Sequence, residues 1–167
     1  MPIVTTWNLL HRIHAENWRE PATGARLDEA PAARLLGWVA EGRIVACQDV
    51  GGDVLAALRR GLPAGASLWS FCYPRVPRLR VDGGAGPLDP SERLVTVAGP
   101  GLAGREVAAE AFATDSGKGL LVVDVAGLRV INTHVSHGER RGRQLAQLAA
   151  RAGEGPAALL GDFNARR

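Results

Sequence analysis

Residues 159–165 read Leu-Leu-Gly-Asp-Phe-Asn-Ala, so an acid and an amide stand two positions apart directly after an apolar run. The run itself predicts a short buried strand that breaks at the glycine. Side chains at positions i and i+2 of an extended strand point the same way. We therefore expect Asp162 and Asn164 to project into one site, while Phe163 turns toward the core. This pair suits phosphate chemistry, and an Asx-turn is the structural alternative.

The length and composition predict one globular domain that spans residues 1–167. A chain of 17.6 kDa with 46% hydrophobic residues is long enough to bury a sizeable core. The formal net charge of +3 permits a polyanionic partner without arguing for one. No apolar run of membrane-spanning length occurs and the amino terminus lacks the features of a secretory signal, so we expect a cytoplasmic protein. Cys47 and Cys72 lie in apolar runs and are expected as buried thiols, with a disulfide as the alternative.

The elements expected along the chain are those of an α/β protein. Apolar and β-branched runs predict strands at 2–9, 43–48, 66–73, 92–98, 105–113 and 156–160, and a hairpin-like pair over 119–134. Helical spacing predicts helices over 29–41, from Asp53 to Gly61, and to about 152 after the capping-box spacing of Ser136 and Glu139. In the last of these helices, Leu145 is expected to face the core. Residues 74–91 form a long loop, which is usually functional or disordered.

Polar side chains collect at the ends of the predicted strands, where sites lie on α/β folds. These residues are Asn8, Asp49, His134, Asp162 and Asn164. Asn8 and Asp49 offer the hard oxygen ligands that Mg²⁺ takes together with water and substrate phosphate. Paired cysteines and an HExxH motif are absent, which argues against zinc.

The other three residues suit the chemistry of a phosphate ester. His134 is able to contact a phosphate oxygen or to transfer a proton. Asp162 is suited to orient or deprotonate a water, and Asn164 to hold that carboxylate or the phosphoryl oxygens. Together the five residues predict metal-assisted in-line hydrolysis. Structural alternatives stay open: Asn8 as a turn cap, Asp49 as the cap of the following helix, and His134 as a hydrogen-bonded core histidine.

Four short motifs resemble the endonuclease/exonuclease/phosphatase superfamily. In chain order they are TWN (6–8), CQDV (47–50), INTHVSH (131–137) and LLGDFNA (159–165). The resemblance implies a four-layer αββα sandwich with the site at one edge of its two sheets. It also implies a Mg²⁺-dependent phosphoesterase, a phosphodiesterase, nuclease or phosphatase, for which Mn²⁺ is a plausible substitute ion.

The resemblance further implies a role for each site residue. Asn8 matches the family's asparagine near the metal, and Asp49 its acidic metal ligand, which is a glutamate in the family. His134 matches the histidine that contacts the scissile phosphate. Asp162 and Asn164 match the aspartate that aligns the nucleophile and the asparagine that assists it.

The family continues well past its GDFN motif, to a late strand that ends in an aspartate and a histidine. We therefore expect this domain to be incomplete at its C-terminus, with an unfinished sheet edge. Three explanations stay open: a fragment, an assembly completed by a partner chain or a second copy, and a catalytically impaired homologue that binds phosphate or protein. The substrate also stays open among DNA, RNA, inositol phosphates, lipids and small phosphate esters.

Overall fold

The computed structural model describes residues 2–9, 29–75 and 91–165. Most of the predicted loop at 74–91 lies outside the described residues. The elements in chain order are β1 (Val4–Asn8), α2 (Glu29–Ala40), β2 (Ile44–Gly51), α3 (Gly52–Gly61), β3 (Ser67–Cys72), β4 (Glu92–Ala98), β5 (Gly104–Phe112), β6 (Asp115–Val125), β7 (Leu128–His134), α4 (Arg140–Ala152) and β8 (Ala157–Asp162).

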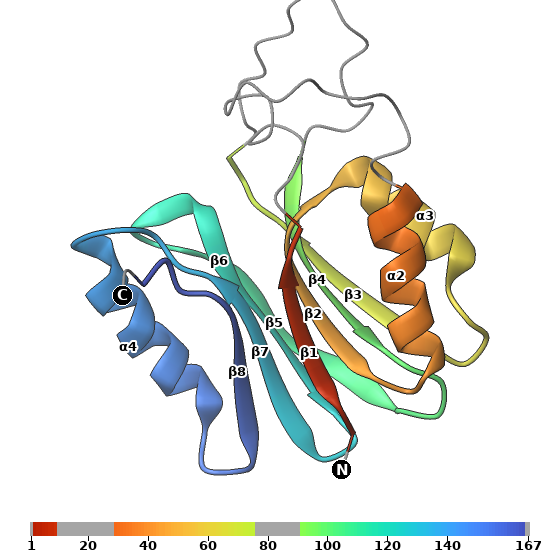
Figure 1. Cartoon of the computed structure of the whole chain (residues 1–167). Coiled ribbons are helices and arrows are strands. Elements are labelled where there is room, and N and C mark those ends of the chain that lie inside the picture. The colour runs from red at the N-terminus through yellow and green to blue at the C-terminus, as the bar shows by residue number, and fades with distance from the viewer. Residues whose placement is uncertain (1, 10–28, 76–90, 166–167) are drawn as a thin grey trace, which may run out of the picture.

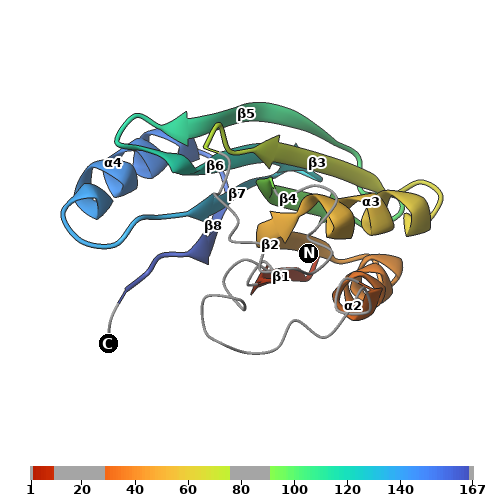
Figure 2. The same ribbon diagram turned by 90° about the horizontal axis from the view of Figure 1, so that it is seen from above.

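The strands form two four-stranded mixed sheets that pack face to face. The first has the order β1-β2-β4-β3 and the second the order β5-β6-β7-β8. The pairs β1–β2 and β7–β8 are parallel and the others are antiparallel. Helices α2 and α3 lie beside the first sheet and α4 lies beside the second, each on the outer side (Figures 1 and 2). The predicted αββα sandwich is therefore confirmed.

Three apolar clusters fill the spaces between the four layers. One joins α2 and α3 to the first sheet, through residues such as Leu35, Leu55 and Val95. The second lies between the sheets and the third lies between the second sheet and α4. On α4 only Gln144 and Leu148 are buried. Leu145 is 39% exposed, so the prediction that it faces the core was wrong.

A β-bulge interrupts β2 at the end that carries polar residues. Cys47 pairs with Val95 and Val50 with Arg93, so two residues of β2 stand opposite one residue of β4. A bulge of this kind bends its strand and re-aims a side chain. Asp49 lies in the bulge and has φ 52°, a left-handed conformation that aspartate tolerates better than most residues.

The bounds of β2 and of the helix that follows it differ from the predicted ones. β2 continues to Gly51, past the predicted end at residue 48, and α3 begins at Gly52 with Gly51 as its N-cap. Asp53, the predicted first residue of this helix, lies in its first turn. The alternative in which Asp49 caps the helix is therefore wrong, and its side chain is available to the site.

A buried amide fastens the two sheets together beside the bulge. Asn132 of β7 is fully buried, and its Nδ2 donates to the backbone oxygens of Cys47 and Val95, each at 3.0 Å. Its Oδ1 accepts a hydrogen bond from Nε2 of Gln48 at 2.7 Å. These bonds join β7 of one sheet to β2 and β4 of the other. His134 follows two residues later, at the edge where the strands end.

Two local predictions need correction, one before α4 and one at the cysteines of β2 and β3. Glu139 is the N-cap of α4 without a side-chain capping bond, and Ser136 Oγ donates instead to Asp115 at 2.8 Å. The predicted capping box is therefore wrong. Both cysteines are free, as expected, but only Cys47 is buried while Cys72 is exposed.

Strand β8 forms one edge of the second sheet. Among the described residues, β8 pairs with β7 alone, and Leu159 on it is 42% exposed. A partner chain or second copy at this edge stays a prediction. No helix of the described ranges has the length and apolar character that crossing a membrane requires.

Candidate active site

The five predicted site residues meet at one end of the sandwich. Nδ2 of Asn8 donates to Oδ2 of Asp162 at 2.8 Å, which joins β1 to β8. Nδ1 of His134 lies 2.8 Å from Oδ1 of Asp49, which joins β7 to β2. Nε2 of His134 lies 3.6 Å from Oδ2 of Asp162 and 3.2 Å from Nδ2 of Asn164. One continuous network thus connects residues that are up to 156 positions apart in the sequence (164 − 8).

The pair formed by Asp49 and His134 is almost completely buried, with side chains 3% and 5% exposed. Burial alone raises the pKa of the Asp49 carboxyl, because it penalises the charged form. The hydrogen bond and charge of His134 outweigh burial, with smaller contributions from Lys118 and Asn8, and they lower this pKa to about 2. Asp49 is therefore a carboxylate at any pH near neutrality.

Asp162 and Asn164 form a tight local turn rather than an extended pair. β8 ends at Asp162, and Asn164 has φ 47°, a left-handed conformation. The backbone N–H of Asn164 donates to Oδ1 of Asp162 at 2.8 Å, as in the Asx-turn alternative. Both side chains still lie beside His134, so the observed Asx-turn leaves the functional interpretation open as a prediction. Phe163 packs against the cluster under α4, as expected.

The hydrogen-bond network assigns the proton of the neutral His134 ring to Nδ1. Asp49 accepts hydrogen bonds only, so the ring nitrogen that faces it is a donor. Asn164 Nδ2 also donates to the backbone oxygen of Val135 at 2.7 Å, which fixes the orientation of its amide. Nε2 lies between one donor, Asn164 Nδ2 at 3.2 Å, and the Asp162 carboxylate at 3.6 Å. The Asp49 contact fixes the ring, and Nε2 is directed toward Asp162 and Asn164.

Lys118 of β6 is a site residue that the sequence analysis missed. Its Nζ lies 2.9 Å from both ring nitrogens of His134 and 3.9 Å from Oδ1 of Asp49. Burial lowers the pKa of this ammonium group, Arg75 lowers it further, and Asp49 and Glu92 partly oppose the shift. The signal in the sequence was a cation between two glycines, at 117 and 119, at the start of an apolar strand.

Two further acids line the same end of the sandwich. Glu92 begins β4 and is buried, and Asp115 begins β6 with its side chain 11% exposed. Asp115 accepts hydrogen bonds from Ser136 Oγ and from the Gly117 backbone N–H. With Asp49 and Asp162, these residues give four carboxylates. We call this group the acid basin.

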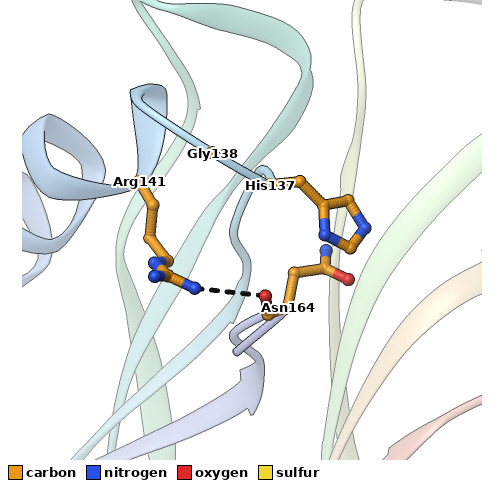
Figure 3. A pocket seen from close by; sticks show the side chains of 4 residues that line it. All are labelled: His137, Gly138, Arg141 and Asn164. Atoms are coloured by element: carbon orange, nitrogen blue, oxygen red, sulfur yellow. Dashed lines mark hydrogen bonds between the residues drawn. The ribbon is translucent and has the colours of Figure 1, made fainter. Parts of the chain in front are cut away.

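A pocket adjoins Asn164 on the outer side of the network. It has a volume of about 370 Å³ and is lined by His137, Gly138, Arg141 and Asn164. Figure 3 shows that the His137 and Asn164 side chains lie close together at this pocket, while Arg141 donates to the backbone oxygen of Asn164 at 3.2 Å. The pocket gives a group bound beside Asn164 room to extend toward the start of α4.

The donor set fits a hard cation better than a soft one. Within the described ranges, no three His, Cys, Asp or Glu residues are arranged to enclose a metal by themselves. Mg²⁺ needs no such enclosure, since it uses one or two carboxylates and keeps its waters or substrate oxygens. The Asn8 amide lies against two carboxylates, Asp162 at 2.8 Å and Asp49. The buried charge of the acid basin favours a cation at this place.

Comparisons with known proteins agree with this architecture. No family sequence model and no curated protein sequence matches the chain. Among solved structures, the human Nocturnin catalytic domain with bound sulfate anion superposes with a TM-score of 0.63 at 17% identity, covering 99% of this chain and 66% of that one. An endonuclease/exonuclease/phosphatase from Bacteroides vulgatus gives 0.57 at 16% identity, covering 96% and 64%. The chain has the endonuclease/exonuclease/phosphatase fold.

A third structure with this fold is D. rerio TDP2 complexed with single strand DNA product. It gives a TM-score of 0.59 at 16% identity and covers 97% of this chain and 60% of that chain. The chain therefore spans about two thirds or less of the length of these three structures. At such identities the likeness concerns the fold, and the site has to be argued from its own residues.

Proposed function

We propose that the protein is a Mg²⁺-dependent phosphoesterase that hydrolyses a phosphodiester by in-line attack of water. The observation that carries the proposal is the placement of His134 between two carboxylates. Its Nδ1 is 2.8 Å from Asp49, its Nε2 is 3.6 Å from Asp162, and Asn164 lies beside Nε2. An imidazole held in this way has one fixed nitrogen and one nitrogen directed to a reactant.

Asn8 and Asp49 are the residues that we assign to the metal. Their oxygen atoms are of the type that Mg²⁺ or Mn²⁺ takes, and the low pKa of Asp49 keeps this carboxylate charged. A bound divalent cation supplies charge neutralisation at the phosphoryl oxygens. Asp49 is one methylene shorter than a glutamate, and from its place in the bulge of β2 it contacts His134 at 2.8 Å.

The chain's own residues divide the remaining tasks. Asp162 has a side chain that is 31% exposed, and both its oxygens are positioned by hydrogen bonds, from Asn8 and from the Asn164 backbone. We assign it to orient and deprotonate the attacking water. With a second proton, on Nε2, the ring of His134 would donate to a phosphoryl oxygen while Nδ1–H stays bonded to Asp49. Lys118 lies 2.9 Å from the same ring and neutralises charge that develops on the phosphoryl group.

We propose single-stranded nucleic acid as the substrate class to test first. The structure of D. rerio TDP2, which has the same fold, contains a single strand DNA product, and that of human Nocturnin contains a sulfate anion. The pocket beside Asn164 offers His137 and Arg141 to a neighbouring part of such a substrate. A small phosphodiester without neighbouring groups is the matched comparison, because it uses the site and leaves the pocket empty.

The test measures hydrolysis of bis(p-nitrophenyl) phosphate and of a fluorescent single-stranded oligonucleotide, with and without Mg²⁺ or Mn²⁺. The variants are Asp162→Asn and His134→Gln, which keep hydrogen-bonding groups of similar size. We expect each to lower kcat/KM by roughly 100-fold or more, since a positioned acid or base contributes about 10²–10⁴. Asp124→Asn is the control, because Asp124 is a β6 carboxylate near the other end of that strand, paired with Arg129.

Unchanged hydrolysis in both site variants would refute the assignment of the site. The rival is a binding module that keeps the fold without turnover. Equilibrium titration with Mn²⁺ and with the oligonucleotide separates the two. Binding that needs Asp49 and Asp162, together with no hydrolysis under any condition, favours the binding module.

A further inference from the structure

Tyr73 is held rigidly at the base of the acid basin, although no part of the mechanism above uses it. It follows β3 directly, and its backbone N–H donates to the oxygen of Glu92 at 3.0 Å. The side chain is 1% exposed and belongs to the apolar cluster between the two sheets. Its ring meets that of Phe71 edge to face, with centroids 5.9 Å apart and planes at 84°. The position of the phenol is therefore fixed by packing.

The hydroxyl of this tyrosine has no hydrogen-bond partner. It is the one buried side-chain polar atom in the described part of the chain for which this holds. A buried hydroxyl left unpaired costs about 1–3 kcal/mol, and phenylalanine would fill the same space without that cost. The fold by itself gives no reason for the oxygen atom.

The hydroxyl lies within electrostatic reach of the acid basin. The carboxylates that act on it electrostatically are the four members of the acid basin, Asp49, Glu92, Asp115 and Asp162. They come from four strands in both sheets, and they meet at the site. Burial, followed by these carboxylates, raises the pKa of Tyr73 well above its usual range, so the phenol is a neutral donor.

All four members of the acid basin, Glu92 included, already interact with other groups. Asp49 is held by His134, and Asp115 accepts from Ser136 Oγ and the Gly117 backbone. Asp162 accepts from Asn8 and from the backbone of Asn164. Turning one of these carboxylates toward Tyr73 would break bonds that the structure makes. In the described part of the chain none of these carboxylates accepts from Tyr73, so we look for the acceptor in the ligand.

We propose that Tyr73 is a positioning residue whose hydroxyl donates a hydrogen bond to an oxygen atom that arrives with the ligand. The oxygen belongs either to the phosphoryl group or to a water of hydration of the divalent cation. The chemical class of the ligand rests on the proposed function, whereas the unpaired hydroxyl does not. Through this bond Tyr73 holds the bound oxygen against the acid basin from its buried side.

The main test compares the wild type with Tyr73→Phe in the presence of Mg²⁺ alone, inorganic phosphate alone, and both. Without these probes, we expect the variant to have a Tm equal to or above that of the wild type, because an unpaired hydroxyl has been removed. With the probe that supplies the acceptor, the wild type gains more in Tm. We expect the Kd of that probe to be about 5- to 10-fold weaker in the variant, the loss of one hydrogen bond.

The chain contains a single tyrosine, so 3-fluorotyrosine labels this position alone. We expect its ¹⁹F resonance to shift on addition of the same probe that separates the two proteins in Tm. Phe71→Leu is the control variant, since it disturbs the packing of the ring and keeps the hydroxyl. It should lower the Tm and leave the Kd of each probe within about twofold of the wild-type value.

The outcomes separate the sources of the oxygen. A response to Mg²⁺ alone assigns the acceptor to a water of hydration, and a response that needs phosphate assigns it to a phosphoryl oxygen. Equal Kd values in wild type and Tyr73→Phe, with a stationary ¹⁹F resonance, overturn the inference, as does failure of every probe to bind the wild type. Hydrolysis is measured separately. If the protein does not hydrolyse any substrate but the Kd difference and the ¹⁹F shift at Tyr73 are seen, the result counts against the proposed function alone. If the protein hydrolyses its substrate but neither the Kd nor the ¹⁹F resonance depends on Tyr73, the result counts against this inference alone.

Discussion

The amide of Asn132 allows a sharp test of how the two sheets are held together. Replacing it by leucine keeps the approximate volume and removes four hydrogen bonds: two to the backbone oxygens of Cys47 and Val95, a longer one to Thr96 Oγ1 at 3.3 Å, and one from Gln48. Gln48 Nε2 keeps its bonds to Thr6 Oγ1 at 3.1 Å and to the Ala46 oxygen at 3.2 Å. The cost therefore falls mainly on the two backbone oxygens. At about 1–2 kcal/mol for each buried unpaired group, we expect Asn132→Leu to lower the free energy of unfolding by about 2–4 kcal/mol.

The assay is urea unfolding followed by tryptophan fluorescence, for the single variants Asn132→Leu and Gln48→Leu and for the double variant. A single 2.7 Å bond links the two side chains, so we expect a coupling energy of about 1 kcal/mol. Thr133→Val is the control, because this hydroxyl bonds to the Gly119 oxygen within one sheet. A free energy of unfolding within about 0.5 kcal/mol of wild type in Asn132→Leu would refute the argument that this amide fastens the sheets.

Three further predictions concern stability at low pH, the reactivity of the two thiols, and the effect of replacing glycines by alanine. The pKa of Asp49 is about 2 in the folded protein against an ordinary 3.8, so its stabilisation is complete above about pH 4 and is lost as the pH falls through 2. Urea unfolding should therefore show the wild type losing about 2 kcal/mol more than Asp49→Asn between pH 5 and pH 2. With DTNB, we expect the exposed Cys72 alone to react in the folded protein and Cys47 only in urea, because burial raises the pKa of Cys47 to about 12. Gly161→Ala should lower the free energy of unfolding by about 3 kcal/mol, because a Cβ there would lie 2.0 Å from the Thr133 backbone oxygen. Gly142→Ala should raise it by about 0.5–1 kcal/mol, because a Cβ on this residue of α4 meets no atom within 4 Å.

A residue's position was predictable where it follows from a place at a strand end. Asn8, His134 and Asp162 each close an apolar strand, and such ends meet at one edge of a sandwich. Pattern and resemblance together therefore predicted the layers and brought the five site residues to one place. The Asx-turn at Asp162 was also visible in the sequence, as an alternative, because it needs only neighbours within two positions.

The features that were missed depend on partners far away in the chain. The bulge at Asp49 is fixed by the pairing of β2 with β4, and no local signal at 48–49 marks it. Lys118 on β6 contacts His134 on the neighbouring strand β7. Tyr73 interacts electrostatically with acids from both sheets. Leu145 has the spacing of a core residue, but Gln144 and Leu148 form the buried face of α4, and Leu145 is 39% exposed. Periodicity gives the face of an element and leaves open what lies opposite.

The motif Asn132-Thr133-His134 shows why a chemical motif and a structural one are easily confused. Successive strand residues alternate between faces, so Asn132 and His134 point to the same inner side of β7. Asn132 bonds to backbone oxygens of the opposite sheet, and His134 bonds to Asp49, which the bulge brings out of that same sheet. The asparagine thus fixes the distance between the sheets at the point where the histidine must reach its carboxylate. A substitution at Asn132 should therefore lower activity by displacing Asp49 from His134, without any contact between Asn132 and the substrate.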